Sequence, residues 1–253
     1  MKKAVVFLMA FCMSAHLFSQ RNDNAEYWNT WRYTAKEGMQ QKFEEAAAKK
    51  TAMFNTTPET AIVTYRFITG PNSGTYMRIE ARKSPADYDK DRSAEGNYWR
   101  DNVSKYAANN GGQVRWQLLN GGTINYDPEN PAPPAKFVRM VTFNVKADGV
   151  RAFRRWMYRA SKVIEKRGNK NPRMLFRLES GGNRNQFVLA LPYESHKRTD
   201  PPRENENTWR EDYNELFGWG TFEEDGENID ASFEFWGEQV ETLQLVPAMS
   251  TKM

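Results

Sequence analysis

The sequence contains almost no cysteine or histidine. Its 253 residues include one cysteine, Cys12, and two histidines, His16 and His196. A chain with so few thiol and imidazole groups has no disulfide framework and no zinc site built from cysteine and histidine ligands. The same shortage argues against a cysteine nucleophile and a histidine general base. Without disulfides, the fold must be stabilised by its apolar core.

A large excess of charge of one sign is also missing. The 36 lysine and arginine residues are interleaved with 32 aspartate and glutamate residues, which leaves a formal net charge of +4. Because no broad positive field results, we expect no nucleic-acid partner. The motifs of phosphate-binding loops, dinucleotide-binding folds, serine hydrolases and zinc proteases are absent as well. Asp87, Asp89 and Asp91 alternate as in a calcium loop. Arg92 and Tyr98 stand where an EF-hand needs glycine and glutamate, so no metal site is predicted.

One long apolar run is present, near the N-terminus. Lys2 and Lys3 precede the run Ala4–Met13, which is too short for a comfortable membrane span. This order is typical of a secretory signal peptide, and we place its end at Ser19. Residues 1–19 are therefore expected to be removed, leaving a periplasmic or secreted protein with no stable membrane insertion. The alternative is a buried N-terminal helix.

The rest of the sequence contains the same pattern twice. Arg66–Asn72 aligns with Arg177–Asn183 at a spacing of 111 residues. Downstream, Trp99–Asp101 aligns with Trp209–Glu211 at a spacing of 110 residues. Such self-similarity predicts two structural units that share one fold.

Each unit is expected to have the order strand, helix, strand, strand, helix, strand. In the first unit we predict strands over 28–35, 61–69, 75–82 and 113–119, with helices over 39–54 and from 99 to near 111. In the second unit we predict strands over 136–145, 174–180, 185–191 and 240–246, with helices over 148–164 and 209–217. The recurrence of apolar residues at strand or helix spacing supports these assignments.

This order is that of a ferredoxin-like unit, βαββαβ, whose helices cover one sheet face and leave the other face without a partner. Two such units on one chain can pack sheet to sheet. We therefore predict an α+β protein with a first ferredoxin-like repeat over 20–126, a proline-rich extended linker over 127–135 and a second repeat over 136–253. Together the two repeats are expected to form a pseudo-dimeric α+β barrel.

In this element order, in the duplication and in the hairpin sequence Arg66–Gly74, the chain resembles the dimeric α+β barrel superfamily over most of residues 27–250. It is similar to the antibiotic-biosynthesis-monooxygenase-like and NIPSNAP-like groups, and the resemblance implies a duplicated and fused barrel. Members of that superfamily include haem-binding enzymes, cofactor-free oxygenases and proteins without known activity. The resemblance therefore implies a fold and leaves these functions open.

Alternation along the predicted strand Thr75–Arg82 separates its two faces. Tyr76, Arg78 and Glu80 share one face, which we expect to line the cleft between the two sheets. Charged groups buried in such a cleft need partners or a ligand. The alternative is that Arg78 and Glu80 form a salt bridge that fills the space between the sheets.

Arg66 and Arg177 are related by the duplication and are expected to approach the pseudo-twofold axis together. Two guanidinium groups there favour a carboxylate or a phosphate, whereas at strand ends they would pair with surface acids. Trp31 is expected to form a wall of the cleft beside Tyr76. We predict no cofactor. If the barrel does bind haem, His196 is the candidate ligand of the iron. The charged residues around His196 favour instead a solvated histidine in a loop.

These residues define the functional prediction. The chain is expected to be an exported envelope protein that binds a small amphipathic or anionic molecule in the cleft between its sheets, without catalysis. The predicted ligand-binding residues are Trp31, Arg66, Tyr76, Arg78, Glu80 and Arg177. One alternative is a cofactor-free or haem-dependent oxygenase-like enzyme that uses the same pocket. A second alternative is a structural envelope protein with a filled barrel.

Overall fold

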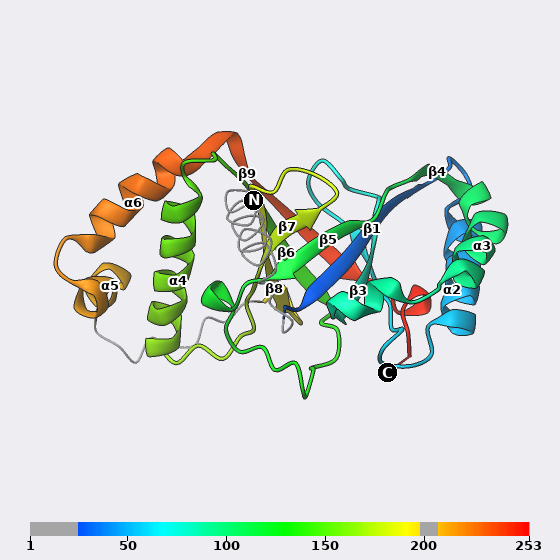
Figure 1. The fold of residues 1–253 in the computed structure, drawn as a ribbon, viewed down its shortest axis with the longest axis horizontal. Coiled ribbons are helices and arrows are strands. Elements are labelled where there is room, and N and C mark those ends of the chain that lie inside the picture. The colour runs from blue at the N-terminus through cyan, green and yellow to red at the C-terminus, as the bar shows by residue number, and fades with distance from the viewer. Residues whose placement is uncertain (1–24, 198–206, 253) are drawn as a thin grey trace, which may run out of the picture.

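The computed structural model describes residues 25–197 and 207–252 of the chain. The predicted signal peptide, residues 1–19, lies outside these residues, so export stays a prediction. Among the described residues, no helix combines the length and apolarity that a membrane crossing requires. The described strands and helices form two similar units (Figure 1).

The first unit has the ferredoxin-like order of elements. Its strands and helices are β1 (Tyr27–Ala35), α2 (Gln40–Phe54), β2 (Val63–Phe67), β3 (Tyr76–Lys83), α3 (Ser93–Asn102), β4 (Ala107–Asn110) and β5 (Val114–Leu118). The long strands lie in the order β2-β3-β1-β5, and the short β4 pairs with the C-terminal end of β1. The second helix both begins and ends earlier than predicted: it starts at Ser93, and after Asn102 the chain enters β4 through a 3₁₀ turn at Ser104–Tyr106.

The second unit repeats this order with one added helix, α6, and without a counterpart of the short β4. Its elements are β6 (Phe137–Val145), α4 (Val150–Lys166), β7 (Met174–Ser180), β8 (Gln186–Tyr193), α5 (Trp209–Phe217), α6 (Thr221–Ser232) and β9 (Phe233–Leu245). The sheet order β7-β8-β6-β9 matches the first unit strand for strand. Further 3₁₀ turns lie at Pro85–Asp89, Asn120–Gly122 and Pro247–Met249.

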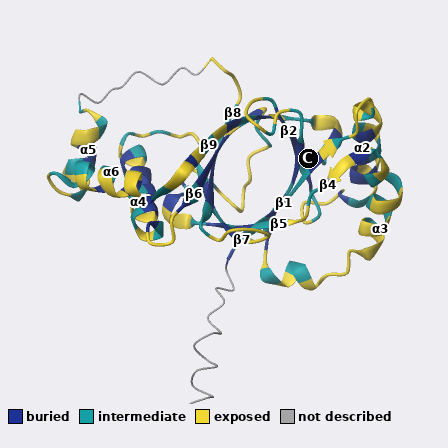
Figure 2. Ribbon diagram, turned by 90° about the horizontal axis from the view of Figure 1, so that it is seen from above, coloured by how far each residue is buried: buried dark blue, intermediate teal, exposed yellow. Residues whose placement is uncertain are grey.

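The sheets of the two units join edge to edge into one closed barrel (Figure 2). β2 pairs with β9, with Phe67 opposite Leu243, and β5 pairs with β7, with Trp116 opposite Leu178. Eight described strands therefore close a ring in the order β1-β3-β2-β9-β6-β8-β7-β5. Helices α2 and α3 lie on one flank of the ring, and α4, α5 and α6 lie on the opposite flank. The predicted pseudo-dimeric barrel of two ferredoxin-like units is confirmed.

The interior of the barrel is apolar and is built by both units. Its buried cluster contains Tyr65, Phe67, Met77, Trp116, Leu118, Met140, Phe176, Leu178, Val188 and Leu243. A second cluster, around Phe153 and Phe187, lies between the second sheet and α4. A third, around Phe43 and Tyr76, lies between the first sheet and α2. Burial of apolar area, at roughly 25 cal/mol per Å², is the main stabilising term in a chain whose single cysteine permits no internal disulfide.

Candidate functional site

Strand β3 directs Arg78 and Glu80 away from the barrel interior. Met77 belongs to the interior cluster and Ile79 packs against it, whereas Tyr76, Arg78 and Glu80 face α2 and α3. The prediction that these three residues line the cleft between the sheets is therefore wrong. The apolar side chains of β3 have apolar partners inside the barrel, and the helices supply the polar partners that the charged side chains need.

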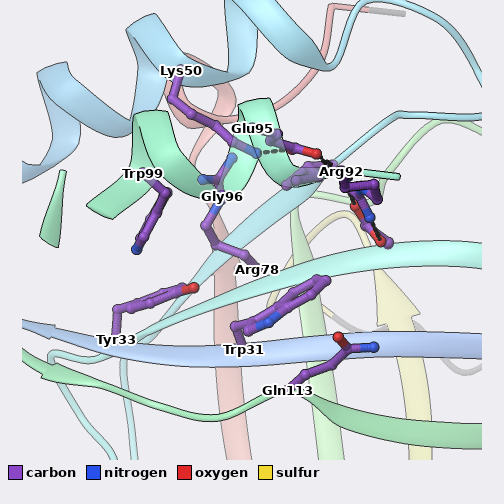
Figure 3. A pocket seen from close by; sticks show the side chains of 11 residues that line it. Trp31, Tyr33, Lys50, Arg78, Arg92, Glu95, Gly96, Trp99 and Gln113 are labelled. Carbon is purple, nitrogen blue, oxygen red and sulfur yellow. Dashed lines mark hydrogen bonds and ion pairs between the residues drawn. The ribbon is translucent and has the colours of Figure 1, made fainter. Parts of the chain in front are cut away.

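A cavity of about 270 Å³ lies on this outer side of the first sheet (Figure 3). Trp31 and Tyr33 of β1 line it from the sheet, and Lys50 of α2 with Glu95 and Trp99 of α3 line it from the helices. Elements that are distant in the sequence thus meet around one small space. This cavity, called the first-unit pocket below, is the candidate functional site.

Two carboxylates at the first-unit pocket are engaged by two cations. Glu80 is completely buried and accepts a hydrogen bond from Arg92 Nη1 at 2.7 Å. Arg92 also donates from Nε to Glu95 at 2.8 Å, and Lys50 forms an ion pair with Glu95. Asn55 accepts from Lys50 at 2.9 Å and donates to Glu95 at 3.0 Å. Burial raises the pKa of Glu95, but Lys50 and Arg92 bring it below its usual value.

The pKa of Lys50 is strongly lowered in this environment. Burial and, to a smaller extent, the charge of Arg78 lower the pKa of its amine to about 8, and Glu95 opposes both effects. The amine is therefore charged at neutral pH but loses its proton far more easily than an exposed lysine.

Arg78 is the cation of the pocket without an ion-pair partner. Its side chain is 2 % exposed, and no carboxylate of the described chain lies within 4.0 Å of its guanidinium. One terminal nitrogen donates to Thr51 Oγ1, and Nε is buried without an acceptor. The guanidinium lies over the ring of Trp99, with its central carbon 5.0 Å from the ring centroid. The predicted alternative, a salt bridge between Arg78 and Glu80, is not formed because Glu80 pairs with Arg92.

Burial lowers the pKa of Arg78 to about 10, although Tyr33, Glu95 and Glu80 oppose this effect. The guanidinium is therefore still charged at neutral pH. A buried charge without a counter-ion is costly, and such a group attracts an anion strongly.

Aromatic rings give the pocket an apolar lining. The rings of Tyr33 and Trp99 are 4.6 Å apart between centroids, and Trp31 lies beside Tyr33 on the sheet side (Figure 3). Burial raises the pKa of Tyr33 to about 12, so its hydroxyl is neutral and able to donate a hydrogen bond. The hydroxyl has no hydrogen-bond partner within the described part of the chain, and it points toward the space between Arg78 and Trp31.

The structure brings together three of the six residues predicted to bind a ligand. Trp31, Arg78 and Glu80 all line the first-unit pocket. Tyr76 faces the same helices but lies outside this pocket, where its hydroxyl donates to the side chain of Glu44. The grouping of Arg78 and Glu80 on one face was correct, and their placement inside the barrel was not.

Arg66 and Arg177 do not meet at the pseudo-twofold axis. Arg66 lies over the ring of Tyr76 on the outer face of β2, and Arg177 lies over the ring of Phe187 on the outer face of β7. The residues on either side of each arginine belong to the interior cluster, so alternation turns both arginines outward. The prediction that they converge on one ligand is wrong.

The aromatic and charged pocket residues that were not predicted as site residues are Tyr33, Lys50, Arg92, Glu95 and Trp99. Lys50 carries a usable signal, because it is the charged member of the otherwise apolar stripe of its helix. A lysine at a core-facing position is rarely buried without a partner. Arg92 and Glu95 lie in a polar segment, where nothing in the local sequence distinguishes them from surface charges.

The corresponding layer of the second unit is filled with apolar side chains. Phe187 and Leu189 occupy the positions that Tyr76 and Arg78 occupy in the first unit. Phe187 packs against Phe153 of α4 at 4.6 Å between ring centroids. The two units thus differ as the sequence indicates, one charged and one apolar, but the difference lies on the helix side of each sheet.

No protein-family model and no curated protein matches the chain. Solved structures do match it. A proposed monooxygenase from Lactobacillus acidophilus NCFM superimposes with a TM-score of 0.53 at 14% identity, covering 90% of this chain and 97% of that one. A proposed monooxygenase from Fusobacterium nucleatum subsp. nucleatum gives a TM-score of 0.54 at 11% identity, covering 87% and 92%. A proposed chlorite dismutase gives 0.51 at 10% identity, covering 89% and 96%.

The likeness extends over nearly the whole of each chain. The protein has the dimeric α+β barrel fold, fused in one chain. Because the identities are 14% or lower, the likeness of this barrel to those proteins establishes the fold alone. What the barrel does must be argued from its own residues.

The described residues do not offer a histidine placed to ligate a haem group. A haem iron needs an axial ligand, and His196 is the histidine that the described residues offer. His196 is exposed beyond the end of β8, and its ring lies 4.3 Å from the ring of Phe137 between centroids. Phe153 and Phe187 fill the layer beneath α4. The described residues also contain no group of three histidine, cysteine, aspartate or glutamate side chains arranged to hold a metal ion.

Proposed function

We propose that this protein binds a small anionic molecule in the first-unit pocket, between the first sheet and helices α2 and α3. The observation that carries the proposal is the buried guanidinium of Arg78, which has no carboxylate partner within 4.0 Å in the described chain. An anion in the pocket supplies the missing counter-charge. The proposal moves the predicted ligand from the cleft between the sheets, which apolar side chains occupy, to the helix side of one sheet.

The charges around the pocket support this assignment. Three cations, Lys50, Arg78 and Arg92, face two carboxylates, Glu80 and Glu95. Arg92 contacts both carboxylates and Lys50 contacts Glu95, so the uncompensated positive charge resides on Arg78. In a partly desolvated site this charge interacts with an anion far more strongly than it would in water.

The size and lining of the pocket support a small amphipathic ligand. Its volume of about 270 Å³ lies just below the range of roughly 300–1,000 Å³ that is usual for drug-sized ligands. Trp31, Tyr33 and Trp99 offer ring surfaces to an apolar body, and Arg78 offers a charged contact at one side. We propose ligand binding without catalysis.

Replacing Arg78 with methionine tests the proposal. Methionine keeps much of the side-chain length, and the substitution removes a buried charge whose transfer from water is costly without a partner. We therefore expect Arg78→Met to fold, with an unfolding temperature equal to or above that of the unmodified protein. Loss of the charged contact should weaken binding of 2-naphthoate, measured by isothermal titration calorimetry, by about tenfold or more.

Arg66→Met is the matched control, because Arg66 lies outside the pocket and the substitution is chemically the same. It should bind 2-naphthoate as the unmodified protein does. Equal affinities for the unmodified protein and Arg78→Met, or no binding of small anions by a folded unmodified protein, would reject the proposal.

We also propose that the protein is exported to the periplasm or secreted. The support is the N-terminal order of Lys2, Lys3 and the apolar run Ala4–Met13, which lies outside the described residues. Expression in an exporting bacterial host followed by intact-mass measurement should give a chain that lacks residues 1–19. Recovery of the uncleaved chain from the cytoplasm would contradict export.

A further inference from the structure

We infer that the first-unit pocket takes a flat monocarboxylate, an aromatic acid of one or two rings with a single negative charge. The inference rests on the proposed function and adds the chemical class of the ligand. Three features of the pocket carry it: the balance of its charges, the orientation of its donors and the placement of its rings.

The charge balance favours one negative charge over two. The pocket has one more cation than carboxylates, so a monoanion brings it to neutrality. Glu80 and Glu95 both act electrostatically on Arg78, which places their charges within range of any ligand bound there. A second negative charge on the ligand would be repelled by these carboxylates in a partly desolvated space. Phosphate monoesters carry about −1.5 to −2 charge at neutral pH and are therefore disfavoured.

The donors of the pocket suit a planar acceptor. The guanidinium of Arg78 is held by its hydrogen bond to Thr51 and by its position over the ring of Trp99. A guanidinium fixed in this way presents its remaining N–H groups in one plane, which matches the plane of a carboxylate. The hydroxyl of Tyr33, which is directed toward the same space, is a further donor.

The rings of the pocket suit a flat apolar body. Trp31 and Tyr33 stand on the sheet side of the space and Trp99 stands on the helix side (Figure 3). Aromatic faces and edges on two sides favour an aromatic ring over a saturated ring of similar size, because stacked and edge-to-face contacts add to simple burial. The small volume limits the body to one or two rings.

A matched ligand series tests the class. Dissociation constants are measured by calorimetry for 2-naphthoate, its neutral amide 2-naphthamide, its saturated analogue decalin-2-carboxylate, and 2-naphthyl phosphate, on the unmodified protein, Arg78→Met and Glu95→Gln. We expect 2-naphthoate to bind at least about tenfold more tightly than each of the other three. Glu95→Gln should reduce the discrimination against 2-naphthyl phosphate, because it removes one of the two repelling charges.

The outcomes separate this inference from the proposal beneath it. If 2-naphthyl phosphate or decalin-2-carboxylate binds as tightly as 2-naphthoate, and Arg78→Met weakens that binding, the pocket binds anions but the monocarboxylate class is wrong. If 2-naphthamide binds as tightly as 2-naphthoate, or if none of the four probes shows binding that depends on Arg78, the proposed anion site itself is wrong.

Discussion

Single residues determine the chemistry of the first-unit pocket, and two of them, Lys50 and Arg78, are coupled. Both are buried cations, and the charge of Arg78 contributes to the low pKa of Lys50. Glu95 contacts Lys50 directly but lies farther than 4.0 Å from the guanidinium of Arg78. Glu95 therefore pairs with Lys50 and leaves the charge of Arg78 available to a ligand.

This coupling predicts how Lys50 titrates. Replacing Arg78 with methionine should raise the pKa of Lys50 above about 8, because one of the influences that lower it is removed. Saturation with 2-naphthoate should shift the pKa in the same direction, since a nearby anion favours the protonated amine. NMR titration of the lysine side chains measures both shifts, with Lys50→Arg used for assignment. A midpoint that stays the same in both experiments would contradict the placement of Arg78 and the ligand beside this amine.

The pKa of Lys50 also has a consequence for stability. Its folded value of about 8 lies below its ordinary value of 10.5, so the folded state binds this proton less tightly than the unfolded state. The contribution of Lys50 therefore makes the protein more stable as the pH rises from about 8 toward 10.5. In Lys50→Met this contribution should vanish, and denaturant unfolding at several pH values measures the difference.

At the residue level, the sequence predicts groupings better than locations. Alternation correctly placed Arg78 and Glu80 on one face of β3, apart from Met77. It did not identify which face turns into the barrel. Residues on both faces of β3 are buried, one set in the barrel interior and the other beneath the helices, so alternation alone does not distinguish the two sides. The ion pairs of Arg92 and Glu95 depend on tertiary contacts that no local pattern records.

At the scale of elements, the turn between β2 and β3 joins the two units. Glu241 of β9 is completely buried and accepts hydrogen bonds from the backbone N–H of Asn72 at 3.2 Å and from its side-chain amide at 2.8 Å. Gly70 has a φ of +81°, and a Cβ at this residue would lie 2.7 Å from Glu241 Cγ. The glycine is therefore required by its backbone conformation and by the close approach of β9.

A pair of glycine substitutions separates these two requirements. Gly74 also has a left-handed φ, +89°, but a Cβ there meets nothing within 4 Å. Gly74→Ala should therefore lose about 1–2 kcal/mol from backbone conformation alone. Gly70→Ala should lose more than Gly74→Ala, because it also displaces the buried carboxylate. Denaturant unfolding measures the difference, and equal losses would show that the contact with Glu241 does not constrain this turn.

Elements with strong local signals were predicted, and those that depend on distant contacts were not. The hairpin of β2 and β3 is marked by its cluster of glycine, proline and asparagine, which favours a turn. Helix α6 has no such signal, because Gly226 and the acidic residues around it favour a loop. Its Asp225 is buried and bound by Arg159 and Tyr213, so tertiary contacts stabilise the helix.

At the scale of the whole molecule, the duplication explains the barrel. Each ferredoxin-like sheet has one face without helices, and the two uncovered faces enclose a single apolar cluster. The pairings of β2 with β9 and of β5 with β7 leave no open edge at these four strands. This arrangement was predictable because an apolar sheet face needs a cover and the second repeat supplies one.

The same argument predicts that one unit is not stable alone. A fragment of residues 20–126 would expose the edges of β2 and β5 and its half of the interior cluster. We expect this fragment to unfold or to self-associate. Analytical ultracentrifugation with circular dichroism tests this expectation. A folded monomeric fragment would contradict the view that closure of the barrel holds the units together.

The central claim is that Arg78 anchors an anion in the first-unit pocket. Its most direct test is ¹⁵N-edited NMR of the arginine Nε–H groups during titration with 2-naphthoate, with the Arg78 resonance assigned by its loss in Arg78→Met. We predict that this resonance shifts and saturates with the dissociation constant found by calorimetry, while the resonance of Arg66 stays in place. An Arg78 resonance that does not move at saturating 2-naphthoate would contradict the claim.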